Sequence, residues 1–367
     1  MRPLIYGAIV ALAGSLFAST GAWAQTAEEP AFVPGLDQEA IEPDEAALID
    51  AILQSSLNRL RTQFPDGERP VLRDAHPKTH GLVSAEFIVL DGLPEELRYG
   101  IFAEPRTYQA LIRFSAGNVE VQEDTVPQAA GMAIKLLGVE GEKLLPSESE
   151  ATTQDFIMIN APIFFVRNLK DYAVLHEFLE QGKLAEFFAT RPAQMDAIRI
   201  IRGQQLFNPI QVRYWSMTPY LLGERAIKFS AIPLSRSTNT PPEVMGPYFL
   251  REAMREQLNA EDVYYEFSVQ LQTNPEDMPV EDPLVMWDET EAPFQPVAII
   301  RIPRQDIGED GREAIAENLS FTPWHSLPEH RPLGSNNRAR LVIYEAISKF
   351  RHEMNEAPRE EPTEIPW

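Results

Sequence analysis

The strongest constraint on the fold is a succession of short strand-like segments without regular helices between them. Each segment is rich in Val, Ile and Phe and is bounded by Gly, Pro or acidic loops, which is typical of β-strands. Because βαβ alternation is missing, the pattern predicts an antiparallel barrel and not a doubly wound sheet. The expected strands are His80–Leu90, Thr107–Ala116, Gly131–Gly138, Asp155–Asn160, Ile210–Tyr214, Arg225–Pro233, Val263–Gln272 and Val297–Ile302.

Helical periodicity occurs at both ends of the chain and in its middle. Asp44–Gln63 has apolar residues at helical spacing, and Arg338–Met354 has an amphipathic stripe. Leu169–Ala197 reads as helices interrupted near Pro192, and Pro241–Leu258 as one more. The fold class expected is therefore α+β, an antiparallel eight-stranded barrel with inserted and C-terminal helices.

Met1–Ala24 reads as a secretory signal peptide. Arg2 supplies a short positive region, an apolar stretch follows, and Ala22-Trp23-Ala24 fits an A-x-A cleavage site. The alternative is an uncleaved N-terminal anchor, but the apolar stretch is short for a membrane span. We expect cleavage after Ala24 and a periplasmic or secreted protein without stable membrane insertion.

Composition bounds the remaining chain. The formal net charge is −23, which argues against nucleic-acid binding and against polybasic attachment to anionic lipid. The chain has no cysteine, so thiolate metal sites and cysteine nucleophiles are excluded. The expected organisation is an acidic, Pro-rich, loose arm over 25–43, one domain over 44–355 and an acidic tail over 356–367.

Two polar groups stand out near the first strands. Arg73 precedes His76 by three residues, and Arg113-Phe114-Ser115 places an arginine inside an apolar strand. A histidine in such a loop is commonly solvated, and an arginine in such a strand needs an anion. An ion pair with one of the many carboxylates would satisfy Arg113 equally well.

A third group lies in the last helix. Residues four apart share a helical face, so Arg340 can sit beside Tyr344, and Arg351 returns to the same side two turns later. A neighbouring cation favours the phenolate, which is a hard ligand for ferric iron. The alternative is that Tyr344 is an ordinary core residue of an amphipathic helix.

A fourth group is Asn160-Ala161-Pro162-Ile163-Phe164-Phe165, at a change from strand to helix. Its adjacent aromatic side chains could form the wall of a flat apolar ligand, or they could belong to the core. Taken alone, this segment does not separate the two.

Taken together, these groups resemble the haem catalase superfamily, over about Arg73 to Arg351. Arg73 and His76 are similar to its R-x-x-H, Arg113-Phe114-Ser115 to its R-F-S, and Pro162–Arg167 to its P-x-F-F-x-R. Arg340 and Tyr344 match R-x-x-x-Y. The segments Thr152–Phe156 and Trp324–Gly334 resemble sequences of the short bacterial catalase-related (catalase-like haem-binding) subgroup.

The resemblance implies a role for each matching residue, in a site holding ferric haem b. Tyr344 would be the axial tyrosinate ligand, held as phenolate by Arg340. His76 would move the peroxide proton, and Ser115 would orient its ring. The remaining implied haem contacts are propionate pairing by three arginines and packing by one aromatic ring: Arg73, Arg113, Arg351 and Phe164.

Two positions depart from the family pattern. Alignment on the Pro162 segment places the family's distal asparagine at Ile159, with Asn160 one residue later. Adjacent strand residues face opposite ways, so Asn160 reaches the pocket as a catalytic residue only if a bulge turns it back. Tyr172 stands where catalases have a phenylalanine near the haem, which gives a more polar pocket or an oxidisable side chain.

The function implied is a peroxidase that uses hydrogen peroxide or organic hydroperoxides and has weak catalase activity. It would need a peroxide and an electron donor that the sequence does not identify. The alternatives are an enzyme that rearranges fatty-acid hydroperoxides and a non-catalytic haem or lipid carrier. The oligomeric state is left open, with a homodimer as one candidate.

Overall fold

The computed structural model describes residues 35–65, 68–234, 239–309 and 311–367. The predicted signal peptide therefore lies outside the described residues. Within the described part, none of the helices is long and apolar enough to cross a membrane.

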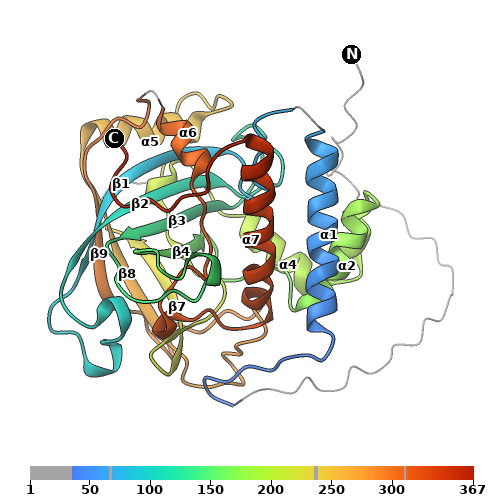
Figure 1. The fold of residues 1–367 in the computed structure, drawn as a ribbon, viewed down its shortest axis with the longest axis horizontal. Coiled ribbons are helices and arrows are strands. Elements are labelled where there is room, and N and C mark those ends of the chain that lie inside the picture. Colours follow the sequence, from blue (N-terminus) through green and yellow to red (C-terminus); the bar gives the residue numbers. More distant parts are fainter. Residues whose placement is uncertain (1–34, 66–67, 235–238, 310) are drawn as a thin grey trace. The chain divides into compact units, whose positions relative to one another are not determined.

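The centre of the molecule is a closed antiparallel barrel (Figure 1). Its strands pair in the order β5-β4-β3-β2-β1-β9-β8-β7, and a further pairing of β5 with β7 closes the ring. The predicted eight-stranded antiparallel barrel is confirmed. The eight strands are β1 Thr79–Val89, β2 Thr107–Ala116, β3 Ala130–Leu137, β4 Thr153–Ile159, β5 Tyr214–Trp215, β7 Arg225–Pro233, β8 Val263–Leu271 and β9 Gln295–Ile302.

Strand alternation decides which residues enter the barrel. Along β2, Ala110, Ile112 and Phe114 belong to the interior core, which also contains a group of packed phenylalanine rings. Arg113 and Ser115 alternate with them and so lie on the outer face. Arg113, which the sequence places in an apolar strand, is therefore outside the barrel and is still buried.

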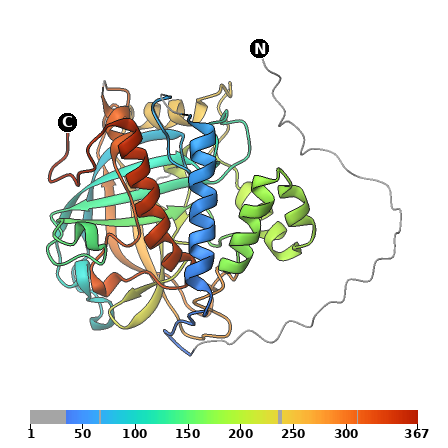
Figure 2. The same cartoon turned by 45° about the vertical axis from the view of Figure 1, so that its right-hand side comes forward.

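Helices lie beside the barrel (Figures 1 and 2). α7 (Ser335–Asn355) packs against α1 (Glu45–Gln63) and α2 (Leu169–Glu180) through a shared apolar cluster. Four more helices are α3 Leu184–Ala189, α4 Pro192–Arg202, α5 Phe249–Ala260 and α6 Arg312–Asn318. Of these, α3 and α4 follow α2 in the inserted segment, and α5 and α6 pack on β1.

The structure differs from the predicted elements at four places. The helix predicted over Pro241–Leu258 begins only at Phe249. The expected strand Ile210–Tyr214 is a 3-10 turn, Pro209–Gln211, followed by the two-residue β5. The Asn208 side chain caps that turn by accepting from the Ile210 amide, and Pro209 has no amide to give to a ladder. The elements missed by the prediction are the short strand β6, Tyr220–Leu222, and the helix α6.

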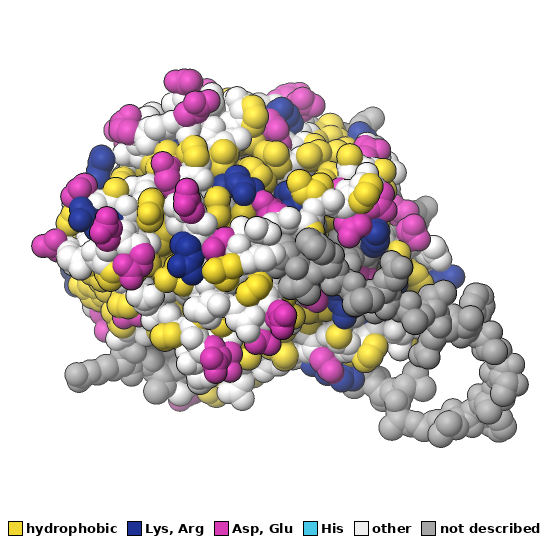
Figure 3. Space-filling view, turned by 90° about the horizontal axis from the view of Figure 1, so that it is seen from below, with side chains coloured by type: hydrophobic (Ala, Val, Ile, Leu, Met, Phe, Trp, Pro, Cys, Tyr) yellow, Lys and Arg dark blue, Asp and Glu magenta, His cyan; other side chains and the backbone are white. Residues whose placement is uncertain are grey.

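The described part of the arm is attached, contrary to the loose segment expected. Asp37 accepts a hydrogen bond from the Ala226 amide at 2.6 Å, and Glu39 pairs with both Arg331 and Arg338 at 2.6 Å. Acidic residues hold this segment in place because their carboxylates pair with arginines and accept a hydrogen bond from a backbone amide. Elsewhere acidic and basic side chains are spread among apolar ones, as the face in Figure 3 shows.

Candidate functional site

His76 is held against the outer face of the barrel. Its backbone takes a φ of 59°, a left-handed conformation that non-glycine residues seldom adopt. Its Nδ1 lies 3.0 Å from Ser115 Oγ. A Cβ built on Gly131 would lie 2.5 Å from Nδ1 and 2.7 Å from that hydroxyl. The imidazole therefore rests on the bare backbone of Gly131, beside Ser115.

The His76 ring is neutral at ordinary pH. Burial, and then the charges of Arg113, Arg340 and Arg73, lower the pKa of His76 to about 3. Ser115 occupies Nδ1, and none of the described residues bonds to the other ring nitrogen. A neutral imidazole with one free nitrogen is suited to general acid–base chemistry.

Three arginines gather around one carboxylate next to His76. Arg73 donates to Glu317 Oε1 at 2.9 Å, and Arg351 lies 3.7 Å from the same oxygen. Arg113 donates to the backbone carbonyl of His76 at 3.0 Å. The sequence motifs in which these arginines occur are thus brought to one place.

This arginine group is short of negative charge. Burial, and then Arg73, lower the pKa of Arg351 to about 9, and burial lowers the pKa of Arg73 and Arg113 as well. Among the described residues, Arg113 Nε has no hydrogen-bond partner. In the part of the chain that the structure describes, these three cations face one carboxylate, that of Glu317. Two positive charges are left over, and two further carboxylates would neutralise them.

An aromatic group completes the site. The Arg340 guanidinium carbon lies 5.7 Å from the Tyr344 ring centre and 6.0 Å from that of Phe164. The Phe164 and Tyr172 ring centres are 6.2 Å apart. Burial lowers the pKa of Arg340, but Tyr344 and other tyrosines outweigh it and raise that pKa overall. Arg340 thus lies beside the Tyr344 ring, and its charge also lowers the pKa of His76.

Tyr172 and Asn160 are placed as follows. Burial, and then Tyr344, raise the pKa of Tyr172 to about 12, so its phenol keeps its proton. Asn160 follows the end of β4, and its Oδ1 accepts from the Ala130 amide at 2.8 Å. Its side chain is thus engaged with the β3 backbone, and the structure gives it no contact with His76.

Two site residues were missed by sequence reasoning. Glu317 comes from α6, which was not predicted, and it is one of many acidic residues in this chain. Gly131 was read only as the start of a strand. A surplus of arginines over anions in the motifs could have suggested a shared carboxylate, but nothing in the sequence singles out Glu317 or Gly131.

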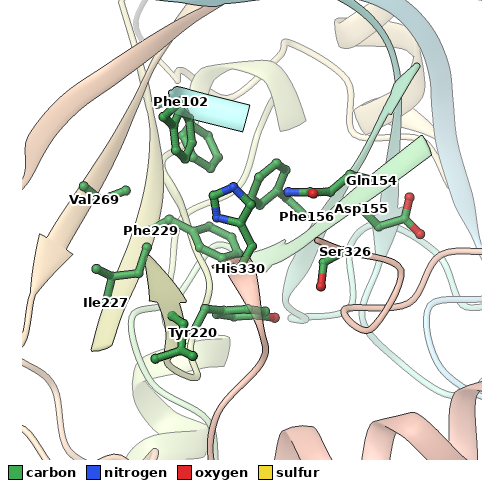
Figure 4. Close-up of a pocket in the computed structure, with 12 residues that line it drawn as sticks. Phe102, Gln154, Asp155, Phe156, Tyr220, Ile227, Phe229, Val269, Ser326 and His330 are labelled. Atoms are coloured by element: carbon green, nitrogen blue, oxygen red, sulfur yellow. The ribbon is translucent and has the colours of Figure 1, made fainter. Parts of the chain in front are cut away.

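A cavity inside the barrel is separate from this site. Figure 4 shows the His330 ring among Phe102, Phe156 and Phe229. The space is about 10 Å³, which is room for a single water molecule and too little for an organic substrate. The His330 Nε2 accepts from the Ile101 amide at 3.0 Å, so this histidine has a structural role.

A second polar cluster joins Glu148, His325 and Glu361, whose ligand atoms lie close enough for a metal ion. Each ligand is already bonded: His325 Nδ1 to Glu148 at 2.7 Å, and Glu361 to Lys135 at 2.6 Å. Arg359 also pairs with Glu148 at 2.7 Å. Two cations beside the cluster disfavour a metal ion, so we read it as a structural ion-pair network.

The residues present fit the haem group that the sequence resemblance implies. The surplus charge of Arg73, Arg113 and Arg351 suits a ligand with two carboxylates, and the unpaired Arg113 Nε offers it a donor. Tyr344 supplies a phenol oxygen beside a cation, and Phe164 supplies an apolar surface. These residues would hold haem through its propionates, its iron and its ring.

No family model matches the chain, and no curated protein matches it in sequence. Solved structures do match. A fungal catalase superposes with a TM-score of 0.64 and 18% identity, over 88% of this chain and 66% of that one. Catalase A from Saccharomyces cerevisiae gives a TM-score of 0.65 and 18% identity, over 90% of this chain and 70% of that one.

The chain thus spans about two thirds of the length of the catalases it matches. The likeness covers 88 to 90% of this chain, and it agrees with the closed eight-stranded ring found above. At 18% sequence identity, structural similarity is evidence of the fold alone. The chain has the catalase fold.

Proposed function

We propose that the chain binds haem b in this site and reduces peroxides as a peroxidase with weak catalase activity. The observation that carries the proposal is a set of three arginines with one carboxylate, next to the His76–Ser115 pair. Arg113 and Arg351 are buried, and Arg73 is partly buried. Haem would bring two carboxylates and an iron, and this site offers three cations and a phenol to hold them. The catalase fold of the chain supports the same reading.

The chemistry that haem supplies when bound is the exchange of electrons with the peroxide. The net reaction reduces the O–O bond by two electrons and two protons, giving an alcohol or water plus a second water. The electrons come from an external donor. We propose that Tyr344 would hold the iron through its phenol oxygen, with the Arg340 guanidinium beside its ring.

His76 handles the protons in this proposal. With Nδ1 donating to Ser115 Oγ, Nε2 carries the lone pair that takes a proton from the peroxide oxygen. The same nitrogen returns that proton to the departing oxygen as the O–O bond breaks. The low pKa of His76 keeps the ring neutral, so its unprotonated nitrogen carries a lone pair.

We further propose that the protein is exported, as the N-terminal pattern suggests, and resembles short bacterial catalase-related proteins. In that location haem is inserted after translocation, and the electron donor is periplasmic or extracellular. The absence of cysteine suits a protein exposed to peroxide, because no thiol is available for oxidation.

The decisive experiment combines haem loading with three substrates. Purified protein should be brown, with a ferric tyrosinate-type spectrum, and His76→Ala should keep haem while losing peroxide turnover. Oxidation of an added phenol marks a peroxidase, oxygen release marks a catalase, and consumption of a fatty-acid hydroperoxide without reductant marks the rearranging enzyme. A brown protein inactive with all three is a carrier, and a colourless one that takes up no haemin contradicts the proposal.

A further inference from the structure

One row of paired residues crosses the outer face of the barrel at His76. Ser115 on β2 pairs with Gly131 on β3, Gly131 with Ile159 on β4, and Ile159 with Trp215 on β5. Residues directly opposite in antiparallel strands point to the same face, with Cα atoms about 5 Å apart. The His76 ring rests on Gly131, so the Ile159 side chain lies on the same face, one strand along from the residue beneath that ring.

The surroundings of Ile159 are apolar. It belongs to a buried cluster with Ala161, Ile201 and Met217, against which Phe164 and Phe165 pack. The neighbouring Asn160 follows the end of β4 and has the opposite strand parity. Its Oδ1 accepts from the β3 backbone, and its Nδ2 is buried without a partner among the described residues. Ser115 is already bonded to His76. Within this row, Ile159 therefore places a hydrocarbon side chain beside Gly131, on which the His76 ring rests. It separates that ring from the next donor of the row, Trp215 Nε1, which has no hydrogen-bond partner in the described part of the chain.

We propose that Ile159 makes the site selective for organic hydroperoxides over hydrogen peroxide, an inference that rests on the proposed function. Hydrogen peroxide has a hydroxyl at each end, and burying one hydroxyl without a partner weakens binding by about tenfold to a hundredfold. A hydroperoxide with an apolar substituent instead places carbon against Ile159 and Phe165 and gains from each methylene it buries. Ile159 thus favours the substrate whose far end is hydrocarbon.

The test compares cumene hydroperoxide with hydrogen peroxide in the haem-loaded protein. The wild type should have at least a tenfold higher kcat/KM for cumene hydroperoxide. Ile159→Asn should lower that ratio by about tenfold or more, mainly through the two KM values. Ile157→Asn is the matched control, because it makes the same change on the same strand face one pleat away, and it should leave the ratio unchanged.

A second readout does not depend on turnover. Calorimetric titration with 2-phenyl-2-propanol, the alcohol product of cumene hydroperoxide, should show binding that weakens about tenfold in Ile159→Asn and not in Ile157→Asn. If Ile159→Asn does not fold, Ile159→Thr adds a hydroxyl with little change of shape and carries the same comparison.

The outcomes separate the two proposals. Failure to load haem, or loading without turnover of either peroxide, overturns the proposed function. Turnover with a wild-type preference for hydrogen peroxide overturns the role of Ile159 alone. So does an unchanged ratio together with unchanged alcohol binding in the Ile159 variants.

Discussion

Arg73 and Arg351 share one carboxylate, that of Glu317, although they lie 278 positions apart in the chain. The first leads into the barrel and the second lies on α7, so Glu317 on α6 ties three parts of the fold together. Because Arg113 adds a third cation nearby, Glu317 is the principal anion holding this group in the protein alone.

Glu317→Gln should destabilise the haem-free protein by about 3 kcal/mol, because it leaves buried guanidinium groups without their anion. Urea unfolding measures the change. Glu104→Gln is the control, since Glu104 pairs with Arg98 on an exposed surface and should change stability by less than about 1 kcal/mol. Equal effects of the two substitutions would contradict the buried role of Glu317.

Gly131→Ala should displace His76. The added Cβ would lie 2.5 Å from Nδ1, so the ring must leave its place over β3 and its bond to Ser115. We expect peroxide turnover to fall about a hundredfold or more, in the range of a lost acid–base group. The His76 resonances in NMR spectra should move as well.

Gly246→Ala is the matched control for that substitution. Gly246 has no atom within 4 Å of the new Cβ, so this variant should keep wild-type turnover and spectra. If Gly131→Ala behaves like Gly246→Ala, the ring does not rest where the structure has it.

His80 should contribute to loss of stability in acid. Burial, and then Lys78 and Arg113, lower its pKa from 6.5 to about 3. The unfolded chain therefore binds a proton more readily than the folded one. The stability from neutral His80 is fully present above pH 6.5 and is lost as pH falls from 6.5 towards 3, by about 1.4 kcal/mol per pH unit.

His80→Leu removes this dependence. Neither ring nitrogen of His80 has a hydrogen-bond partner among the described residues, so leucine should be tolerated at pH 7. Urea unfolding between pH 7 and pH 4 should show a shallower decline for His80→Leu than for the wild type. Parallel curves would mean that His80 titrates normally in the folded protein.

The long strands and helices could be predicted because their patterns are local. Thr107–Ala116 and Arg225–Pro233 were predicted with the bounds that β2 and β7 have, since strand alternation and turn residues mark both ends. β5 was misplaced because its two residues carry no periodicity of their own. Pairing with β4 and β7 alone makes it a strand.

The site could be predicted only in part, for the same reason. Motif residues such as His76 and Arg113 were identified together because their order along the chain resembled a known pattern. Glu317 and Gly131 are defined by contacts across the fold. The strand parity of Asn160 could be predicted, and in the structure its Oδ1 accepts from the Ala130 amide. The row that joins Ile159 to Gly131, beneath His76, could not be predicted, because it depends on the pairing register of β3 and β4.

Glu361 in the C-terminal tail should stabilise the barrel. Burial opposes the charge of Lys135 on β3, but Asp155 and Glu361 outweigh it and raise the pKa of Lys135 to about 12. Glu361 accepts from Lys135 Nζ at 2.6 Å and from the Thr153 hydroxyl at 2.6 Å. Glu361→Gln should therefore cost about 2 kcal/mol in urea unfolding, because a fully buried ammonium loses one of its two anions.

Glu364→Gln provides the comparison within the same tail. Glu364 is exposed and lies three positions after Glu361, and its substitution by Gln removes the same charge. It should alter the free energy of unfolding by less than about 0.5 kcal/mol. A smaller or equal loss for Glu361→Gln would show that Asp155 alone holds Lys135. A larger loss would show that these last residues belong to the folded barrel, which an acidic composition by itself would not suggest.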